Sequence, residues 1–346
     1  MKRIAAWFMS ALLLALSLTG CSAGKTETEN RGKSYFTYFD TVSFVYSYAG
    51  DSAEQFDRRS AGASGILGEY HRLFDIYHEY SGENNLCTLN RNAGGESIEV
   101  DRKLIDFLVY AKELYETTDG KMNVMMGSVL SIWHDLRTAA GDDPASARIP
   151  TDEELQTAGE HTDISALEID EENCTVRISD PDASIDGALG KGYATEMAAR
   201  WLEADGALGY VLNVGGNIRI VGTKPDGSGW VTGVKDPANT EKFAVKLMLA
   251  DTSCVTSGSY ERYYTVDGVR YHHIIDEATL FPADYYSSLT VVIKDSALAD
   301  ALSTALFCMP YEDGAALAEN LGAEVLWIFP DGEIRYTPGM EKLIAN

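Results

Sequence analysis

The sequence predicts an α+β fold in a single domain, with mixed or antiparallel sheets and helices packed against them. Helical periodicity is concentrated in the first part of the chain. Short strand-like segments dominate after Leu167. No linker within residues 34–346 is long enough to divide the domain with certainty. The sequence leaves open whether the domain is undivided or forms two lobes.

Residues 1–21 are typical of an export signal: a basic start, an apolar centre and small residues before Cys21. A membrane-spanning helix is the alternative, but the apolar run is short for that role. The ending "LTGC" resembles the lipobox of bacterial lipoproteins, so we expect lipidation at Cys21. A polar tether is expected over 22–33. This interpretation places the protein outside the cytoplasm, lipid-anchored to the bacterial cell membrane.

Charge narrows the classes of partner. The net charge is −25, and cleavage after residue 20 or 21 removes Lys2 and Arg3 but no acidic residue, which takes it to −27. Such an acidic chain argues against nucleic acid as a partner, since phosphate contacts need Lys and Arg. The remaining cysteines lack the spacing of a zinc site and favour free thiols, with two disulfides left open; they are Cys87, Cys174, Cys254 and Cys308.

The first ordered element expected is a strand within 35–50, where aromatic and β-branched residues alternate. A helix follows within 60–81, with its apolar period running through to Tyr77. A second amphipathic helix over 101–123 stops at Asp119-Gly120. Residues 139–165 are polar and interrupted by proline, which predicts a surface excursion.

Beyond Leu167 we expect a series of strands interrupted by two helices, over 190–204 and 297–309. The expected strands are 167–170, 174–179, 210–214, 217–222, 230–235, 243–249, 253–258, 270–276 and 289–294.

The segment "SIDGALGKGYATEMAARWL" (184–202) has the order of a phosphate-binding loop: glycines, a lysine, then a helix. It does not match the P-loop, because Gly187 and Gly190 are too close together and Gly192 follows Lys191 where a Ser or Thr is required. Lysine and glycine amides at a helix N-terminus favour an anion. A tight turn that needs glycine for its backbone angles explains the pattern equally well.

Two further segments carry side chains suited to chemistry. His273 and Asp276 lie on a predicted strand and suit acid–base catalysis, although a histidine there is more often structural. Asp300 and Thr304 stand four residues apart on one helix face and offer oxygen ligands of the kind Mg²⁺ takes. The alternative is a surface Asp with a Thr bonded back to its own helix.

Read in order, these segments resemble the ApbE family of FAD:protein FMN transferases, from about Phe36 to Leu343. The resemblance rests on "YFDTVSFVY", "NNLCTLNRNAG", "KMNVMMGSVLSIWHD", "IDGALGKGYA", "NVGGNI", "TSGSYERYY", "HHIID" and "LADALSTALF", in the family's order and rough spacing. It implies one ApbE-like domain, with the two-lobed alternative placing a flavin cleft between the lobes.

The resemblance also implies a reaction. Members of the family bind FAD and Mg²⁺, transfer FMN to a Thr or Ser hydroxyl of an acceptor flavoprotein and release AMP. The acceptor carries a D-x-x-[ST]-G-A-T motif, which is absent from this chain. Some members hydrolyse FAD instead, so an FAD-binding or FAD-hydrolysing lipoprotein is the alternative.

Site residues follow from the same resemblance. The metal ligands would be the Ala188 carbonyl and the side chains of Asp300 and Thr304, with Lys191 facing the FAD pyrophosphate and Asp186 the flavin or ribityl group. His273 is the candidate base for the acceptor hydroxyl. The expected walls of the flavin and adenine pocket are Tyr77, Asn123, Val124, Met125, Met126, Thr256, Ser257, Gly258 and Ile274.

The chain departs from the family pattern at three places. "HIIDEATLFP" has Glu277 and Leu280 where the family usually has proline and glycine. Because leucine adopts a positive φ only at a cost, we expect the 277–280 loop to take another path. The link after Asp186 is one residue shorter than usual, and "FDT" replaces the common "MGT".

Overall fold

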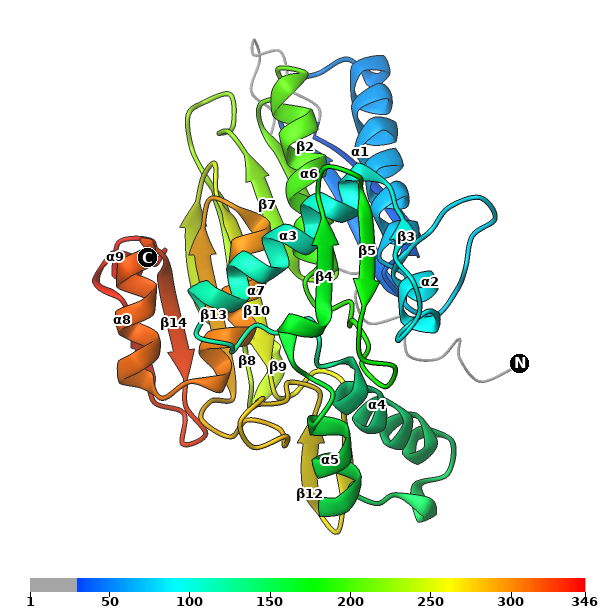
Figure 1. Ribbon diagram of the computed structural model, residues 1–346. Helices are drawn as coiled ribbons and strands as arrows, with labels where there is room; N and C mark the ends of the chain where they lie inside the picture. The colour runs from blue at the N-terminus through cyan, green and yellow to red at the C-terminus, as the bar shows by residue number, and fades with distance from the viewer. Residues whose placement is uncertain (1–29, 346) are drawn as a thin grey trace.

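The computed structural model describes residues 30–345, in which an eight-stranded antiparallel sheet forms the centre (Figure 1). Its order is β1-β2-β6-β7-β10-β13-β14-β15. The strands are β1 (Arg31–Tyr38), β2 (Thr41–Ser47), β6 (Tyr210–Val214), β7 (Asn217–Val221), β10 (Ser253–Gly258), β13 (Ser288–Ile293), β14 (Glu324–Ile328) and β15 (Ile334–Tyr336).

Smaller sheets and the helices surround this sheet. The small sheets are β3-β5-β4, formed by β3 (Ile98–Glu99), β5 (Thr175–Ile178) and β4 (Leu167–Asp170), and the ribbons β8 (Trp230–Asp236) with β9 (Asn239–Leu249) and β11 (Tyr263–Val266) with β12 (Val269–His272). The helices are α1 (Ala53–Leu73), α2 (Leu86–Arg91), α3 (Arg102–Thr117), α4 (Gly127–Asp142), α5 (Asp152–Gly159), α6 (Gly190–Ala204), α7 (Ser296–Ala305), α8 (Tyr311–Leu321) and α9 (Pro338–Glu341). This confirms the α+β prediction with antiparallel sheets.

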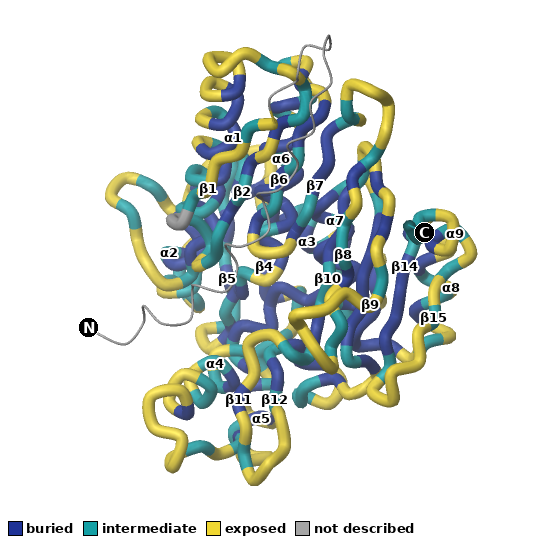
Figure 2. Tube along the Cα trace, turned by 180° about the vertical axis from the view of Figure 1, so that it is seen from behind, coloured by how far each residue is buried: buried dark blue, intermediate teal, exposed yellow. Residues whose placement is uncertain are grey.

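The two faces of the central sheet are covered differently. Alternate side chains of β13 and β14, among them Val291 and Trp327, belong to the large core shared with α1, α3, α6 and α7. Their neighbours Val292 and Leu326 belong to a second core with the β8–β9 ribbon. Figure 2 shows the inner strands of the sheet as mostly buried and much of β9 as exposed. The period-two alternation of a strand therefore builds two cores from one set of strands.

The expected strand at 35–50 is in fact the β1–β2 hairpin. Phe39 and Asp40 form its turn with φ of 53° and 50°, the left-handed conformation that two-residue hairpins require. The first strand already begins at Arg31, so residues 31–33 of the predicted tether lie in the sheet. The predicted signal segment and Cys21 lie outside the described residues.

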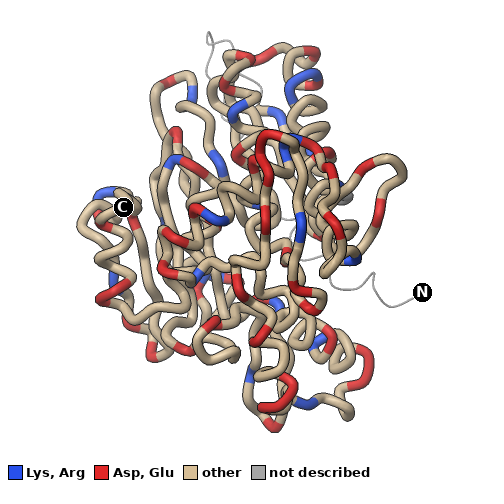
Figure 3. The backbone as a smooth tube through the Cα atoms, in the orientation of Figure 1, with Lys and Arg blue, Asp and Glu red and all other residues tan. Residues whose placement is uncertain are grey.

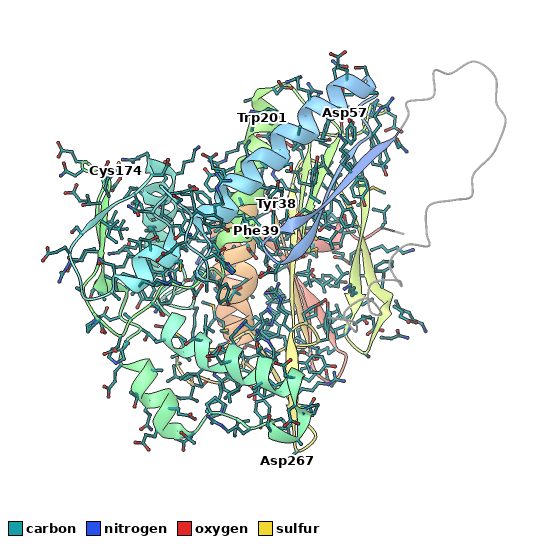
Figure 4. The ribbon with its side chains drawn as sticks, turned by 90° about the vertical axis from the view of Figure 1, so that its right-hand side faces the viewer. Tyr38, Phe39, Asp57, Cys174, Trp201 and Asp267 are labelled. Carbon is teal, nitrogen blue, oxygen red and sulfur yellow. The ribbon has the colours of Figure 1, made fainter. Side chains whose placement is uncertain are left out.

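Helices α1 and α6 lie side by side, as Figure 4 shows with Trp201 labelled on α6. A Cβ on Gly62 of α1 would stand 2.1 Å from the Trp201 ring, so the indole occupies the space that glycine leaves. Helix α1 ends at Leu73, and the prediction that its period continues to Tyr77 was wrong. The Asp75 carboxylate accepts hydrogen bonds from the backbone N–H of Tyr77 (2.7 Å) and of His78 (3.0 Å), which turns the chain out of the helix.

A smaller core lies at one end of the molecule, where α4 and α5 pack with the β11–β12 ribbon (Figure 1). Leu155 and Ala158 of α5 are buried in it beside Trp133. The prediction that 139–165 is only a surface excursion was therefore wrong for α5. The signal was present in "TDEE", where Thr151 and Glu154 form a capping box.

Acidic residues are distributed along the whole described part of the chain (Figure 3). Cys87, Cys174, Cys254 and Cys308 are all free thiols, which decides the question left open by the sequence. Within residues 30–345, no helix combines the length and apolar character needed to cross a membrane.

Candidate functional site

The site is built where the N-terminus of α6 meets α7. A Cβ on Gly192 would stand 2.3 Å from the Asp300 Cβ and 2.7 Å from the Ser296 carbonyl oxygen. Only glycine permits this approach, because such contacts are shorter than packed atoms allow. Gly192 stands where a P-loop has Ser or Thr, and its missing side chain allows α6 and α7 to pack this closely.

This approach redirects one helix hydrogen bond. The Gly192 N–H donates to Asp300 Oδ2 at 2.8 Å, whereas the next bond, from Tyr193 N–H to the Leu189 carbonyl, is helical at 3.2 Å. In a regular helix the Gly192 N–H would bond to the carbonyl of Ala188. Among the described residues no hydrogen bond to the Ala188 carbonyl is found, so this oxygen remains available to a ligand.

Lys191 lies beside the Asp300 carboxylate, and Thr304 follows Asp300 by one turn of α7. The Lys191 Nζ lies 3.8 Å from Asp300 Oδ2, and Asp300 is 7% exposed. The Thr304 hydroxyl donates to the Asp300 backbone carbonyl at 3.4 Å, the back-bonding alternative considered from the sequence. Hydroxyl lone pairs stay free in that bond, so Thr304 retains its capacity as an oxygen ligand.

The loop before α6 is held by neighbouring segments. Asn90 binds the Ile185 backbone on both sides, accepting from its N–H at 2.8 Å and donating to its carbonyl at 2.9 Å. The Asp186 N–H donates to the Val124 carbonyl at 2.7 Å, and the Gly127 N–H donates to the Ser184 carbonyl at 3.1 Å. The loop therefore lies along residues 124–127 as a paired backbone segment, and Asn90 is a positioning residue that the sequence alone did not reveal.

Asp186 is buried, at 5% exposure, and its Oδ1 accepts from the Ala188 N–H at 2.7 Å. Burial raises the pKa of Asp186 to about 7, against the smaller opposite effect of that hydrogen bond. The short link after Asp186 thus folds as a turn closed by its own carboxylate.

His273 follows β12, and its Nδ1 is buried without a hydrogen-bond partner. Burial, followed by the positive charge of Arg262, lowers the pKa of His273 to about 3, with Arg137 and Lys191 contributing in the same direction. The imidazole is therefore neutral at neutral pH, and one of its ring nitrogens carries a free lone pair. Six other buried side-chain atoms among the described residues also lack a partner, so the His273 nitrogen is distinguished by the positive charges around it.

Arg137 of α4 and Arg262 of the β10–β11 turn were not predicted from the sequence. Burial, followed by the positive charge of Arg262, lowers the pKa of Arg137, whose Nη2 lies 3.1 Å from His134 Nδ1. Arg137, Arg262 and Lys191 are therefore the positive charges close enough to His273 to lower its pKa. Such a concentration of donors suits an anion with several oxygens.

Tyr77 lies at the edge of this region. Its side chain is 52% exposed, and its ring centroid lies 5.7 Å from that of His134. Partial burial raises the pKa of Tyr77, while Arg137 opposes the shift. An exposed aromatic ring beside cations offers a flat surface for stacking.

The other predicted wall residues are placed as follows. Asn123, Val124, Met125 and Met126 are all buried, and their side chains pack into the protein. The hydroxyl of Thr256 pairs with that of Thr290 at 2.8 Å, and the hydroxyl of Ser257 with that of Ser303 on α7 at 2.9 Å. Gly258 ends β10, and Ile274 is buried in the large core.

The prediction that the 277–280 loop avoids a positive φ at Leu280 was wrong. Leu280 has a φ of 60°. Its N–H donates to the Asp276 carbonyl at 2.8 Å, its carbonyl accepts from the Trp133 indole at 2.9 Å, and its side chain packs into the smaller core. These contacts offset the cost of about 1–2 kcal/mol for a left-handed leucine.

A second cluster of possible ligands lies elsewhere. His161, Asp180 and Asp182 bring one ligand atom each within 4.8 Å of one another, the one such His, Cys, Asp or Glu group among residues 30–345. The His161 ring is already paired with Asp180 at 2.8 Å, and burial of the group is incomplete. This cluster is explained as a surface ion pair.

Comparison with known proteins gives one consistent result. The model of the family described as ApbE matches residues 41–327. The chain is 33% identical over 272 residues to the FAD:protein FMN transferase of Treponema pallidum, covering 74% of this chain and 73% of the relative. It is 31% identical over 257 residues to that of Vibrio cholerae, covering 73% and 75%.

Solved structures of ApbE proteins resemble this chain in fold, in agreement with the sequence comparisons. A crystal structure of the ApbE protein from Thermotoga maritima superposes with a TM-score of 0.80 at 28% identity, over 92% of this chain and all of that one. The flavin transferase ApbE from Vibrio cholerae superposes with a TM-score of 0.75 at 26% identity, over 91% and 99%.

Proposed function

Because this chain belongs to the ApbE family, we propose that it transfers FMN from FAD to a Thr or Ser hydroxyl of an acceptor flavoprotein, with Mg²⁺ bound and AMP released. The observation that carries the proposal is the junction of α6 and α7. There the Gly192 N–H and Lys191 Nζ lie beside the buried Asp300 carboxylate, Thr304 follows one turn further along α7, and the Ala188 carbonyl is released from its helical bond.

These residues fit a magnesium ion. Carboxylate, carbonyl and hydroxyl oxygens are the hard ligands that Mg²⁺ takes, and the redirected Gly192 hydrogen bond leaves the Ala188 oxygen without another partner. When bound, Mg²⁺ neutralises charge on the phosphate oxygens and orients them. The remaining roles belong to side chains of the protein.

Transfer forms a bond between the acceptor oxygen and the FMN phosphorus and breaks the bond from that phosphorus to the AMP oxygen. Lys191 offsets charge on the pyrophosphate as that bond breaks, and the Arg137 and Arg262 guanidinium groups bind its oxygens. His273 accepts the proton of the attacking hydroxyl. Its low pKa in the free protein reflects burial and three nearby cations, and a bound pyrophosphate brings negative charge that opposes the effect of those cations.

His273→Ala tests the role of this residue. Loss of a general base lowers the transfer rate about 10²–10⁴-fold, and a normal rate would contradict the assignment. FAD binding serves as the control, because the proton is accepted only during transfer.

Two further parts of the proposal concern the cellular location of the protein and its acceptor. We propose that the protein is anchored outside the cytoplasm through lipid on Cys21, and that the acceptor carries a D-x-x-[ST]-G-A-T motif. The signal-like segment 1–21 and the family membership support both.

The alternative is an FAD-hydrolysing or FAD-binding lipoprotein. One assay separates the three activities: the protein is incubated with FAD, Mg²⁺ and an acceptor carrying the motif, and products are measured by intact mass and fluorescence. Transfer adds the mass of FMN, less water, to the acceptor. Free FMN and AMP with an unmodified acceptor would indicate hydrolysis, and bound but unchanged FAD would indicate a binder.

A further inference from the structure

Glu277 connects two segments that are far apart in the sequence. Its Oε1 accepts from the Asn123 side-chain amide at 3.1 Å. Its Oε2 lies over Gly120: a Cβ added to this glycine would stand 3.2 Å from that oxygen. Beside it, Lys121 Nζ donates to Asp276 Oδ1 at 2.7 Å. The loop at 276–280 is therefore attached to residues 120–123 by two side-chain contacts.

Both N–H donors of the Asn123 side chain are engaged in this arrangement. Its amide donates to the Thr162 carbonyl at 2.8 Å as well as to Glu277, and its oxygen accepts from the Met125 N–H at 2.9 Å. The residue is 5% exposed. Removing Glu277 therefore leaves a buried N–H without a partner, which is costly.

The segment that Asn123 begins carries the loop of the candidate site. The Val124 carbonyl accepts from the Asp186 N–H at 2.7 Å, and Met126 pairs with Ser184 in a parallel bridge. Asp186 in turn binds the Ala188 N–H at 2.7 Å. A continuous series of hydrogen bonds thus runs from Glu277 through residues 123–126 to Ala188.

We propose that Glu277 is a positioning residue for FAD binding, which acts by holding Asn123 and thereby fixing the loop 184–190. The proposal rests on the proposed function. Glu277 does not touch the reacting atoms in this account. Burial raises the pKa of Glu277, against the Asn123 hydrogen bond. The carboxyl group of Glu277 can accept a hydrogen bond from the Asn123 amide whether it is charged or neutral. A neutral side chain of the same shape, such as glutamine, can therefore hold Asn123 equally well.

The test compares Glu277→Ala, Glu277→Gln and Glu277→Asp in the full chain with Mg²⁺. FAD binding is measured by flavin fluorescence, and hydrogen exchange is measured over 184–190. We expect the alanine variant to bind FAD about tenfold more weakly, to exchange faster in this loop, and to raise KM for FAD with little change in kcat. Glutamine retains the acceptor and should stay within about threefold of the wild type. Aspartate is too short to reach Asn123 and should weaken binding even if the alanine variant fails to fold.

Glu319→Ala, on the exposed surface of α8, is the matched control and should change neither measurement. Wild-type affinity and exchange in the alanine and aspartate variants would overturn the proposal. So would a glutamine variant as weak as the alanine one, since charge and not the hydrogen bond would then be responsible. If the wild type itself failed to bind FAD, the proposed function would fail, while exchange at 184–190 would still test the connection.

Discussion

Gly192→Ala perturbs the junction of α6 and α7 directly. The new methyl group would lie 2.3 Å from the Asp300 Cβ and 2.7 Å from the Ser296 carbonyl oxygen, so the helices must separate. Overpacking of this kind costs about 1–3 kcal/mol. Loss of the Gly192 N–H bond to the Asp300 carboxylate costs about 1.5–3 kcal/mol more. Alanine recovers about 0.5–1 kcal/mol through its helix propensity.

The free energy of unfolding should therefore fall by about 2–5 kcal/mol, which lowers Tm by about 3–8 °C in a protein of this size. Transfer should fall more than stability predicts, because Asp300 and the Ala188 carbonyl move apart. Gly65→Ala in α1 is the matched control, since a Cβ there meets nothing within 4 Å. Thermal unfolding and FMN transfer are measured on both variants. A Gly192→Ala protein with wild-type Tm and activity would refute this account of the junction.

Three further predictions follow from the site. Asp300→Asn should abolish Mg²⁺-dependent transfer and the rise in Tm that Mg²⁺ gives the wild type, measured by thermal unfolding with and without the ion; an unchanged response would place the metal elsewhere. Arg137→Ala and Arg262→Ala should each weaken FAD binding about 10–100-fold in fluorescence titrations, whereas Arg335→Ala on β15 should not; equal affinities would exclude the anion site. Because burial raises the pKa of Glu277, the folded protein retains a proton there that the unfolded chain has released, so this group's contribution to stability falls as pH rises above its ordinary value. The Tm of Glu277→Gln relative to wild type should therefore increase from pH 4 to pH 7, and a constant difference would contradict the shift.

Much of the fold was predictable because its signals are local. Helix α6 begins at Gly190 and ends at Ala204, the boundaries that periodicity and the glycine turn predicted. Eight of the nine expected strand segments match observed strands closely, because alternation marks a strand whatever it pairs with. The ninth, 270–276, was wrong beyond His272, where β12 ends, so His273 and Asp276 lie outside the strand. The end of α1 was missed because the Asp75 carboxylate, not a helix-breaking residue, turns the chain.

The site was only partly predictable. Lys191, Asp300 and Thr304 were named as site residues through the family resemblance, and the structure places Lys191 Nζ 3.8 Å from Asp300 Oδ2, with Thr304 one turn further along α7. Arg137 and Arg262 carry no local signal, since they converge only when α4 packs beside the β10–β11 turn. Leu280 was misjudged because sequence shows the cost of a positive φ but not the Trp133 hydrogen bond that offsets it.

The most direct test of the central claim is the intact mass of an acceptor carrying D-x-x-[ST]-G-A-T after incubation with this protein, FAD and Mg²⁺. We predict one FMN attached per acceptor through its Thr or Ser, equimolar AMP, and no product with Asp300→Asn or without Mg²⁺. An acceptor that keeps its original mass while FAD is bound or hydrolysed would contradict the claim that the protein is a transferase.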